Sequence, residues 1–178
     1  NTVTTANGTV SITGYTTTIS SNAGTANITG YSATITNASA GTVYVTGNTS
    51  TISSNAGTMY VTGASTTVTA VNDGGRVYIT GASSTVSSIE NGGAAYITGY
   101  SSTITTSNGT VNITGYSNTV TTASGPVNIT GENNTVTTAN GMVYLSGGQG
   151  GNTVTTASSS VFITGHNNTV TNANSVVN

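Results

Sequence analysis

The sequence predicts an all-β fold, a parallel β-solenoid (β-helix) in which the chain winds into stacked coils with two short strands each. Two observations lead to this prediction. The triplet Thr-(Val/Ile)-(Thr/Ser) occurs eleven times along the 178 residues, at steps of 16 to 18 residues. A second triplet, (Ile/Val)-Thr-Gly, once as Leu-Ser-Gly, falls between its copies. The repeat runs from end to end, so residues 1–178 are expected to form a single solenoid domain of about eleven coils.

Both triplets lie in short segments where apolar and polar residues alternate, and this period of two is the strand signal. Gly, Asn, Ser and Ala separate the segments. A helix is disfavoured by the density of Thr, Val, Ile, Gly and Asn and by the single leucine, Leu145. Variation in repeat length falls near Ala40, Asp73, Glu90 and residues 147–151, which are expected to be corners between strands.

The alternation predicts a flattened, thin core with three inward aliphatic side chains in a typical coil. Two come from the Gly-terminated segment, for example Val10 with Ile12. With so little core, hydrogen bonds between coils and stacks of identical side chains are expected to supply most of the stability. Corner glycines such as Gly30 and Gly131 are expected at positions of positive φ. The third inward residue is one of Val3, Ile19, Ile35, Ile52, Val68, Val86, Ile104, Val120, Val136, Val154 and Val170.

Charge is nearly absent, with one Lys or Arg and three Asp or Glu, or 2% of residues against roughly 25% in ordinary domains. A nucleic-acid partner needs several cations and a membrane-surface helix needs a basic face, so both are excluded. No apolar run is long enough for a membrane span. Without cysteine there is no disulfide or thiolate metal site. We expect a non-enzymatic protein with no catalytic residues and no cofactor.

Asp73 and Glu90 are the only candidates for a metal site, and they are weak ones. Both fall in the same corner of adjacent, 18-residue coils. Paired carboxylates bind Ca²⁺ in some proteins, but calcium takes six to eight oxygens. Arg76 offers Asp73 a simple ion pair instead.

A column of tyrosines is expected on the outer face of the Gly-terminated strands, at Tyr44, Tyr60, Tyr78 and Tyr96. Stacked rings stabilise a sheet. Exposed tyrosine is also typical of interfaces, so the column is alternatively a contact surface for a neighbouring subunit or a carbohydrate.

The opposite face is expected to carry two columns of outward Thr, with Ser20, Ser53 and Ser87 in the second column. This array resembles the Thr-x-Thr face of hyperactive insect antifreeze solenoids, which implies ice binding. The alternative is that β-branched Thr is simply a good uncharged residue for an outward strand position. The array comprises Thr2, Thr4, Thr18, Thr34, Thr36, Thr51, Thr67, Thr69, Thr85, Thr103, Thr105, Thr119, Thr121, Thr135, Thr137, Thr153, Thr155, Thr169 and Thr171.

The motif Gly-x-Asn-Asn-Thr-Val-Thr occurs at residues 131–137 and 165–171, and in weaker form at 115–121. It resembles the short-coil repeats of secreted bacterial proteins, surface fibres and adhesins, which implies the fold and an extracellular or cell-surface location. The second Asn of the motif is expected to stack into an amide ladder. The ladder comprises Asn118, Asn134, Asn152 and Asn168.

Three Asn-x-Thr sequons have asparagines that are expected to point outward, at Asn27, Asn112 and Asn128. They are candidate glycan acceptors in a secreted eukaryotic or archaeal protein.

Neither end of the sequence contains a polar cap. The stretch Asn1, Thr2, Val3, Thr4 begins directly on a Thr strand, and Val176, Val177, Asn178 start a Gly-terminated one. Copies therefore stack end to end by strand addition, or the chain is part of a longer solenoid. The first reading predicts an extracellular structural protein that forms a filament with itself as partner. The alternatives are an ice-binding protein and a carbohydrate-binding adhesin.

Overall fold

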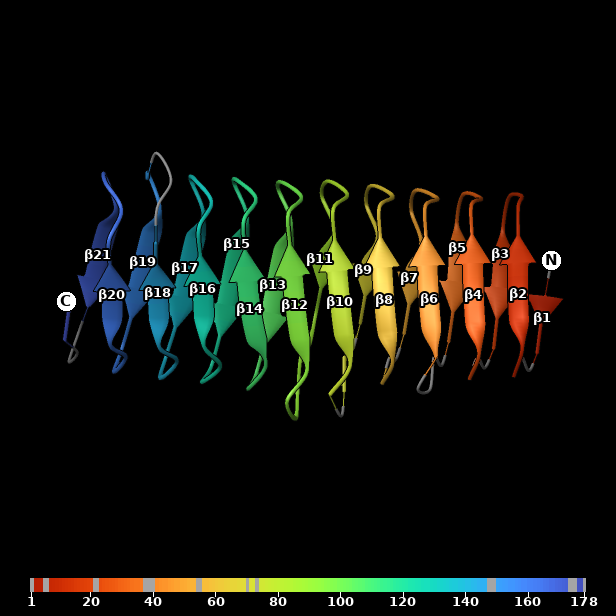
Figure 1. The fold of residues 1–178 in the computed structure, drawn as a ribbon, viewed down its shortest axis with the longest axis horizontal. Coiled ribbons are helices and arrows are strands. Elements are labelled where there is room, and N and C mark those ends of the chain that lie inside the picture. The colour runs from red at the N-terminus through yellow and green to blue at the C-terminus, as the bar shows by residue number, and fades with distance from the viewer. Residues whose placement is uncertain are drawn as a thin grey trace.

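The chain forms a rod of stacked coils in a computed structural model that describes residues 2–4, 7–20, 23–36, 41–53, 56–69, 71–72, 74–146, 150–172 and 176–177. In this described part of the chain, two all-parallel sheets run along the rod, one of eleven strands and one of ten. Figure 1 shows the two sheets as front and back layers, joined by corners at both edges. The predicted β-solenoid is confirmed, with ten complete coils and an eleventh that β21 begins.

The Thr strands form the eleven-stranded sheet, called here the Thr sheet, and the Gly-terminated strands form the Gly sheet. The Thr sheet contains β1 (Thr2–Val3), β3 (Thr17–Ile19), β5 (Ala33–Ile35), β7 (Thr51–Ile52), β9 (Thr67–Val68), β11 (Thr85–Val86), β13 (Thr103–Thr106), β15 (Thr119–Thr122), β17 (Thr135–Thr138), β19 (Thr153–Thr156) and β21 (Thr169–Asn172). The Gly sheet contains β2 (Thr9–Ile12), β4 (Thr25–Ile28), β6 (Thr42–Val45), β8 (Thr58–Val61), β10 (Arg76–Ile79), β12 (Ala94–Ile97), β14 (Thr110–Ile113), β16 (Val127–Ile129), β18 (Val143–Leu145) and β20 (Val161–Ile163).

Consecutive coils pair residue for residue, so like side chains stack along the rod. Tyr78 lies between Tyr60 and Tyr96, and all pairings are parallel. The extra residues of the 18-residue coils turn at a corner and leave this register intact. In one such corner the Gly93 amide donates to the Glu90 carbonyl at 2.9 Å, with a φ of 48° at Asn91 and 81° at Gly92.

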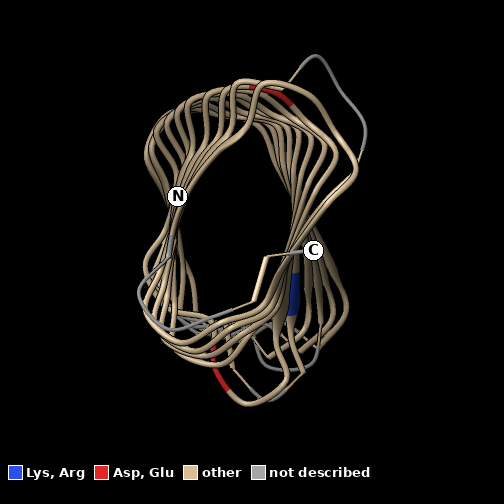
Figure 2. Ribbon diagram, turned by 90° about the vertical axis from the view of Figure 1, so that its left-hand side faces the viewer, with Lys and Arg blue, Asp and Glu red and all other residues tan. Residues whose placement is uncertain are grey.

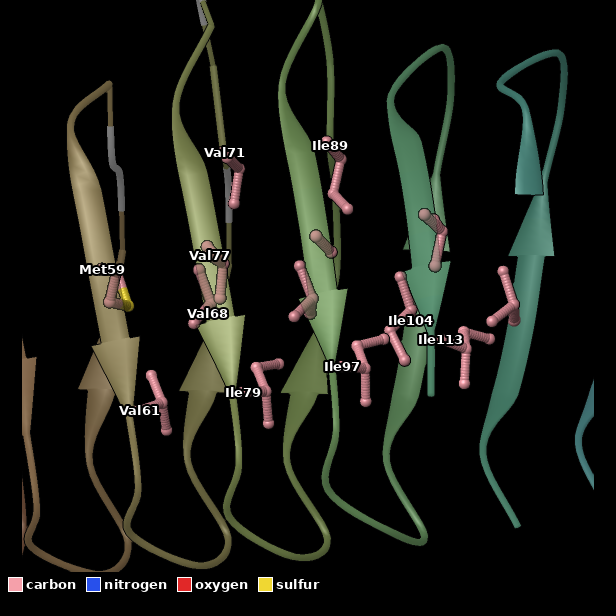
Figure 3. Close-up of a cluster of buried hydrophobic side chains, with 14 of the residues drawn as sticks. Met59, Val61, Val68, Val71, Val77, Ile79, Ile89, Ile97, Ile104 and Ile113 are labelled. Atoms are coloured by element: carbon pink, nitrogen blue, oxygen red, sulfur yellow. The ribbon is translucent and has the colours of Figure 1, made fainter. Parts of the chain in front are cut away.

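The core is the narrow space between the two sheets, filled by the inward side chains of each strand (Figure 3). The predicted inward residues are buried, except at the ends of the rod, where Val3, Val10, Ile163 and Val170 are partly buried. Three core residues were not predicted: Ala33 in β5, and Val71 and Ile89. Val71 and Ile89 are fully buried and pair with each other in the expanded corners. The expanded coils therefore carry an extra apolar residue in the core.

The expectation of positive φ at the corner glycines is wrong. Among the described members of that column only Gly14 has a positive φ, 152°, whereas the residue two positions after each glycine has a φ of 52° to 57°. The glycines are needed for another reason: a methyl group on Gly30 would clash with the Gly14 carbonyl oxygen in the preceding coil. The left-handed residues are Thr16, Ser32, Thr49, Ser65, Ser83, Ser101, Ser117, Asn133 and Asn167.

The close approach of the coils predicts a position-dependent cost of Gly→Ala substitution. A methyl on Gly131 would clash with the backbone of Gly115, whereas one on Gly8 would meet nothing within 4 Å. Gly131→Ala is expected to lower the free energy of unfolding by about 1–3 kcal/mol, the range of an overpacked core. Gly8→Ala is the matched control and is expected to be neutral. Denaturant unfolding followed by circular dichroism measures both, and equal effects would contradict the close-approach explanation.

Candidate functional site

The few charged groups do not gather into one site. Figure 2 shows the described acidic residues at opposite corners of the coil and the only basic residue on one flank. Glu90 accepts a hydrogen bond from the Ser88 hydroxyl at 2.8 Å. Asp73 lies outside the described residues, so its pairing with Glu90 stays a prediction. In the described part of the chain, no group of three or more His, Cys, Asp or Glu residues is arranged to hold a metal ion.

The tyrosine column forms a continuous stack on the outer face of the Gly sheet. Ring centroids from Tyr44 through Tyr60 and Tyr78 to Tyr96 are 5.0, 4.9 and 4.7 Å apart, with interplanar angles of 8° to 11°. These four residues are called the Tyr ladder. Tyr44 and Tyr60 are exposed, while Tyr78 and Tyr96 are half-buried. The stacking geometry agrees with the sequence pattern, and a role in contacts with other molecules stays a prediction.

The Asn ladder, Asn118, Asn134, Asn152 and Asn168, joins coils through side-chain amides; the first three are buried, while Asn168 is half-buried and its Nδ2 has no partner among the described residues. The Asn134 side-chain Oδ1 accepts the Asn118 backbone N–H at 2.8 Å, and its Nδ2 donates to the Gly115 carbonyl at 3.0 Å. Asn118 and Asn152 make the equivalent pairs of bonds. Each of these amides therefore satisfies buried backbone groups in its neighbouring coils, which explains the second Asn of the repeated motif.

Smaller residues occupy the same corner in the first half of the chain and leave it less well bonded. Thr17, Thr66 and Ser84 are buried there, and their hydroxyl groups have no hydrogen-bond partner among the described residues. An unpaired buried hydroxyl is destabilising. The second half of the rod is thus expected to be the more stable half.

The Thr array lies on the outer face of the Thr sheet, in register from coil to coil. Thr105, Thr121 and Thr137 are paired neighbours along the second column. From Thr103 onward both columns are exposed. The third Thr of these strands instead turns inward: Thr106 Oγ1 donates to the Ile89 carbonyl at 2.8 Å and accepts the Gly109 N–H at 2.9 Å. The repeated Thr-Val-Thr-Thr run therefore has two outward threonines and one corner threonine.

A shallow groove of about 610 Å³ runs along four coils beside the second Thr column. Its lining includes the three alanines that directly follow corner threonines, Ala123, Ala139 and Ala157. The sequence signal is the repeated Thr-Val-Thr-Thr-Ala run, whose final small residue was not singled out from the sequence. The groove is lined by Thr105, Thr106, Thr121, Thr122, Ala123, Thr137, Thr138, Ala139, Thr155, Thr156 and Ala157.

The candidate glycan acceptors lie in the middle of strands on the Gly sheet. Asn27, Asn112 and Asn128 are half-buried. Asn128 Nδ2 donates to Asn112 Oδ1 at 2.9 Å, so these two amides form a short ladder. Their glycosylation stays a prediction.

Both end faces of the described stack present unpaired strand edges. β1 and β21 each have a single neighbour in the Thr sheet. At the C-terminal face the Val161 N–H donates to the Val176 carbonyl at 2.9 Å, and Val161 pairs with Val177. Val176 is 58% exposed and Val177 49% exposed. Asn1 and Asn178, the outermost predicted assembly residues, lie outside the described residues.

No protein family, curated protein or solved structure matches this chain. Among the residues that the structure describes, none belongs to a helix long and apolar enough to cross a membrane.

The Asn ladder predicts a large cost for removing one amide. Asn134→Ala leaves the buried Asn118 N–H and Gly115 carbonyl unpaired and is expected to destabilise the protein by at least about 2 kcal/mol. Asn140→Ala is the matched control, because Asn140 is an exposed corner asparagine. It is expected to change stability by less than about 0.5 kcal/mol. Denaturation midpoints test this, and a neutral Asn134→Ala would show that the ladder contributes little.

Proposed function

We propose that this chain is a non-enzymatic structural protein of an extracellular fibre, which lengthens by stacking of coils on coils. The observation that carries the proposal is the in-register parallel pairing of each described strand with the strands one coil before and one coil after, so that the edge of one coil is a template for the next. The outer edges of β1 and β21 are unpaired in the described residues, above a core that is only partly covered. The extracellular location rests on the resemblance of the Gly-x-Asn-Asn-Thr-Val-Thr motif to secreted short-coil repeats.

The two end faces have matching backbone directions and side chains. β1 pairs with β3 through Thr2 with Thr18 and Val3 with Ile19. A β1 strand placed on the open edge of β21 would repeat this pairing, with Val3 over Val170. Such addition of a strand to an open sheet edge is a general mode of association. The same contact serves a second copy of the chain or a further solenoid coil.

Apolar groups at the ends favour this contact. Val3, Val10 and Val170 are only partly buried, although their counterparts inside the rod are fully buried. Stacking would bury them, and each Å² of apolar surface removed from water contributes roughly 25 cal/mol. The unpaired N–H and C=O groups of the edge strands would find partners at the same time.

Charged residues at the end faces are expected to stop lengthening. Val3→Lys with Val170→Lys places an ammonium group at both ends of the core, where stacking would bury it unpaired. Thr67→Lys, in an outward position of a middle coil, is the matched control. Electron microscopy of dilute protein is expected to show filaments for the natural chain and the control, and short separate rods for the end variant. Separate rods of the natural chain would contradict the proposal.

Ice binding is the second candidate function, and the regular register of the Thr array favours it. Thr103, Thr119, Thr135 and Thr153 pair in sequence, and the second column of exposed threonines runs beside them. The array thus presents a methyl and a hydroxyl at each step of about 4.8 Å.

A bulky ring in the array is expected to abolish most inhibition of ice growth, if the Thr face binds ice. Thr121→Tyr with Thr137→Tyr tests this on the Thr sheet. The control, Asn112→Tyr with Asn128→Tyr, changes a Gly-sheet column that already contains tyrosine. Thermal hysteresis is the measurement. Unhindered ice growth with the natural chain, or equal activity of the array variant, would rule out this function.

A further inference from the structure

The groove on the Thr sheet is lined by uncharged threonines and alanines that repeat from coil to coil. Ala123, Ala139 and Ala157 line it together with the second Thr column. It spans four consecutive coils, those of β13, β15, β17 and β19. Because these strands pair in register, the hollow repeats at the same step as the coils.

The Tyr ladder forms a ridge of four stacked rings and spans four coils, as many as the groove. It spans the coils of β6, β8, β10 and β12 on the opposite sheet. Tyrosine is longer than the threonines that flank it on the strand, such as Thr58 and Thr62, so the stacked rings stand above the surface. Centroid spacings of 4.7 to 5.0 Å match the repeat of the groove, because both follow the coil spacing.

We propose that two copies of this chain pair side by side, with the Tyr ladder of one copy seated in the groove of the other. The ridge supplies aromatic edges and hydroxyls, and the groove supplies methyl groups and threonine hydroxyls. Tyrosine is well suited to such a contact because it buries an apolar ring while its hydroxyl keeps a polar partner or water.

Charge complementarity favours a second copy as the occupant. No charged residue lines the groove. Among the described residues of the ridge strands the one charged side chain is Arg76, which shares a strand with Tyr78 and is exposed. An ordinary protein surface, with roughly 25% charged residues, would bury unpaired charges here at a large cost. Another copy of this chain, with 2% charged residues, would bring only Arg76 from the strands of the Tyr ladder, and Arg76 lies at the end of its strand.

The contact area favours antiparallel rods. The ladder occupies coils three to six and the groove coils seven to ten. Antiparallel pairing brings coils three to ten of each copy together, eight coils in all, whereas parallel pairing overlaps only six. With coils about 4.8 Å apart and strands about 13 Å long, eight coils bury roughly 1,000 Å² in total. That is about the lower threshold for a biological interface, and six coils give only roughly 750 Å².

The ladder and the groove lie on opposite sheets, so this contact does not close on itself. Each added copy offers a free ridge or a free groove to the next, and rods would associate into layers. The pairing rests on the proposed fibre for its biological use. It does not require end-to-end stacking, and the two contacts can fail separately.

The test uses complementary variants on a background with blocked ends, Val3→Lys with Val170→Lys. Ala139→Arg fills the groove and leaves the ridge, while Tyr60→Thr with Tyr78→Thr removes the ridge and leaves the groove. Sedimentation equilibrium is expected to show lateral association of the background chain and at least about tenfold weaker association of each variant alone.

A mixture of the two variants is expected to form one-to-one dimers and nothing larger, because only one ridge and one groove remain to pair. Ser11→Arg, an exposed change elsewhere on the Gly sheet, is the control and is expected to associate like the background.

Cross-linking gives a second readout that needs no blocked ends, because the natural chain has no cysteine. A mixture of Tyr60→Cys and Ala139→Cys chains is expected to form mixed disulfide dimers on oxidation, and a mixture of Ser11→Cys and Ala139→Cys chains is not. A monomeric background chain, association of the filled-groove variant, or no selective cross-link would overturn the pairing. Filaments of the natural chain in electron microscopy report on end-to-end stacking independently.

Discussion

The in-register hydrogen bonding of each coil to the next is the constraint on which the rest of the structure depends. Strands in both sheets pair only with the strands one coil before and one coil after. Every outward position therefore becomes a column of stacked side chains, and every corner must pass close to the corner below it. The clash that a methyl on Gly47 would make with Gly30 is one result. The stacked rings of Tyr60 and Tyr78 are another.

The same constraint accounts for the scarcity of charge. A column of charged residues would place like charges one coil apart, at roughly 4.8 Å, and their repulsion would destabilise the stack. Uncharged Thr, Asn, Ser and Tyr avoid this, and Asn additionally bonds along the stack, as Asn134 does to Asn152. Glu90 and Glu132 lie in corners between strands, outside the columns of the two sheets. The composition is thus a property of the architecture, whichever function it serves.

Repetition made the sheets, the register and most of the core predictable, because a period of two and a repeat of 16 to 18 residues leave few alternatives. The role of the corner glycines was wrongly assigned to a left-handed backbone. A repeated glycine is equally expected where a side chain would clash with the next coil, and the sequence does not separate the two causes. Burial of Val71 and Ile89 was missed because these residues occur only in the expanded corners. The groove was missed because Ala139 and its equivalents carry no chemistry of their own and matter only as small lining residues beside larger threonines.

Growth of the rod from its ends is the central functional claim, and high-resolution cryo-electron microscopy of filaments tests it most directly. If β1 of one copy continues the ladder of β21, the map will show coils about 4.8 Å apart across the junction between copies. With the eleven Thr strands of the described residues, the axial rise will be about 53 Å per copy of residues 1–178. A break in the 4.8 Å spacing at the junction, or copies joined only by their sides, would contradict the account.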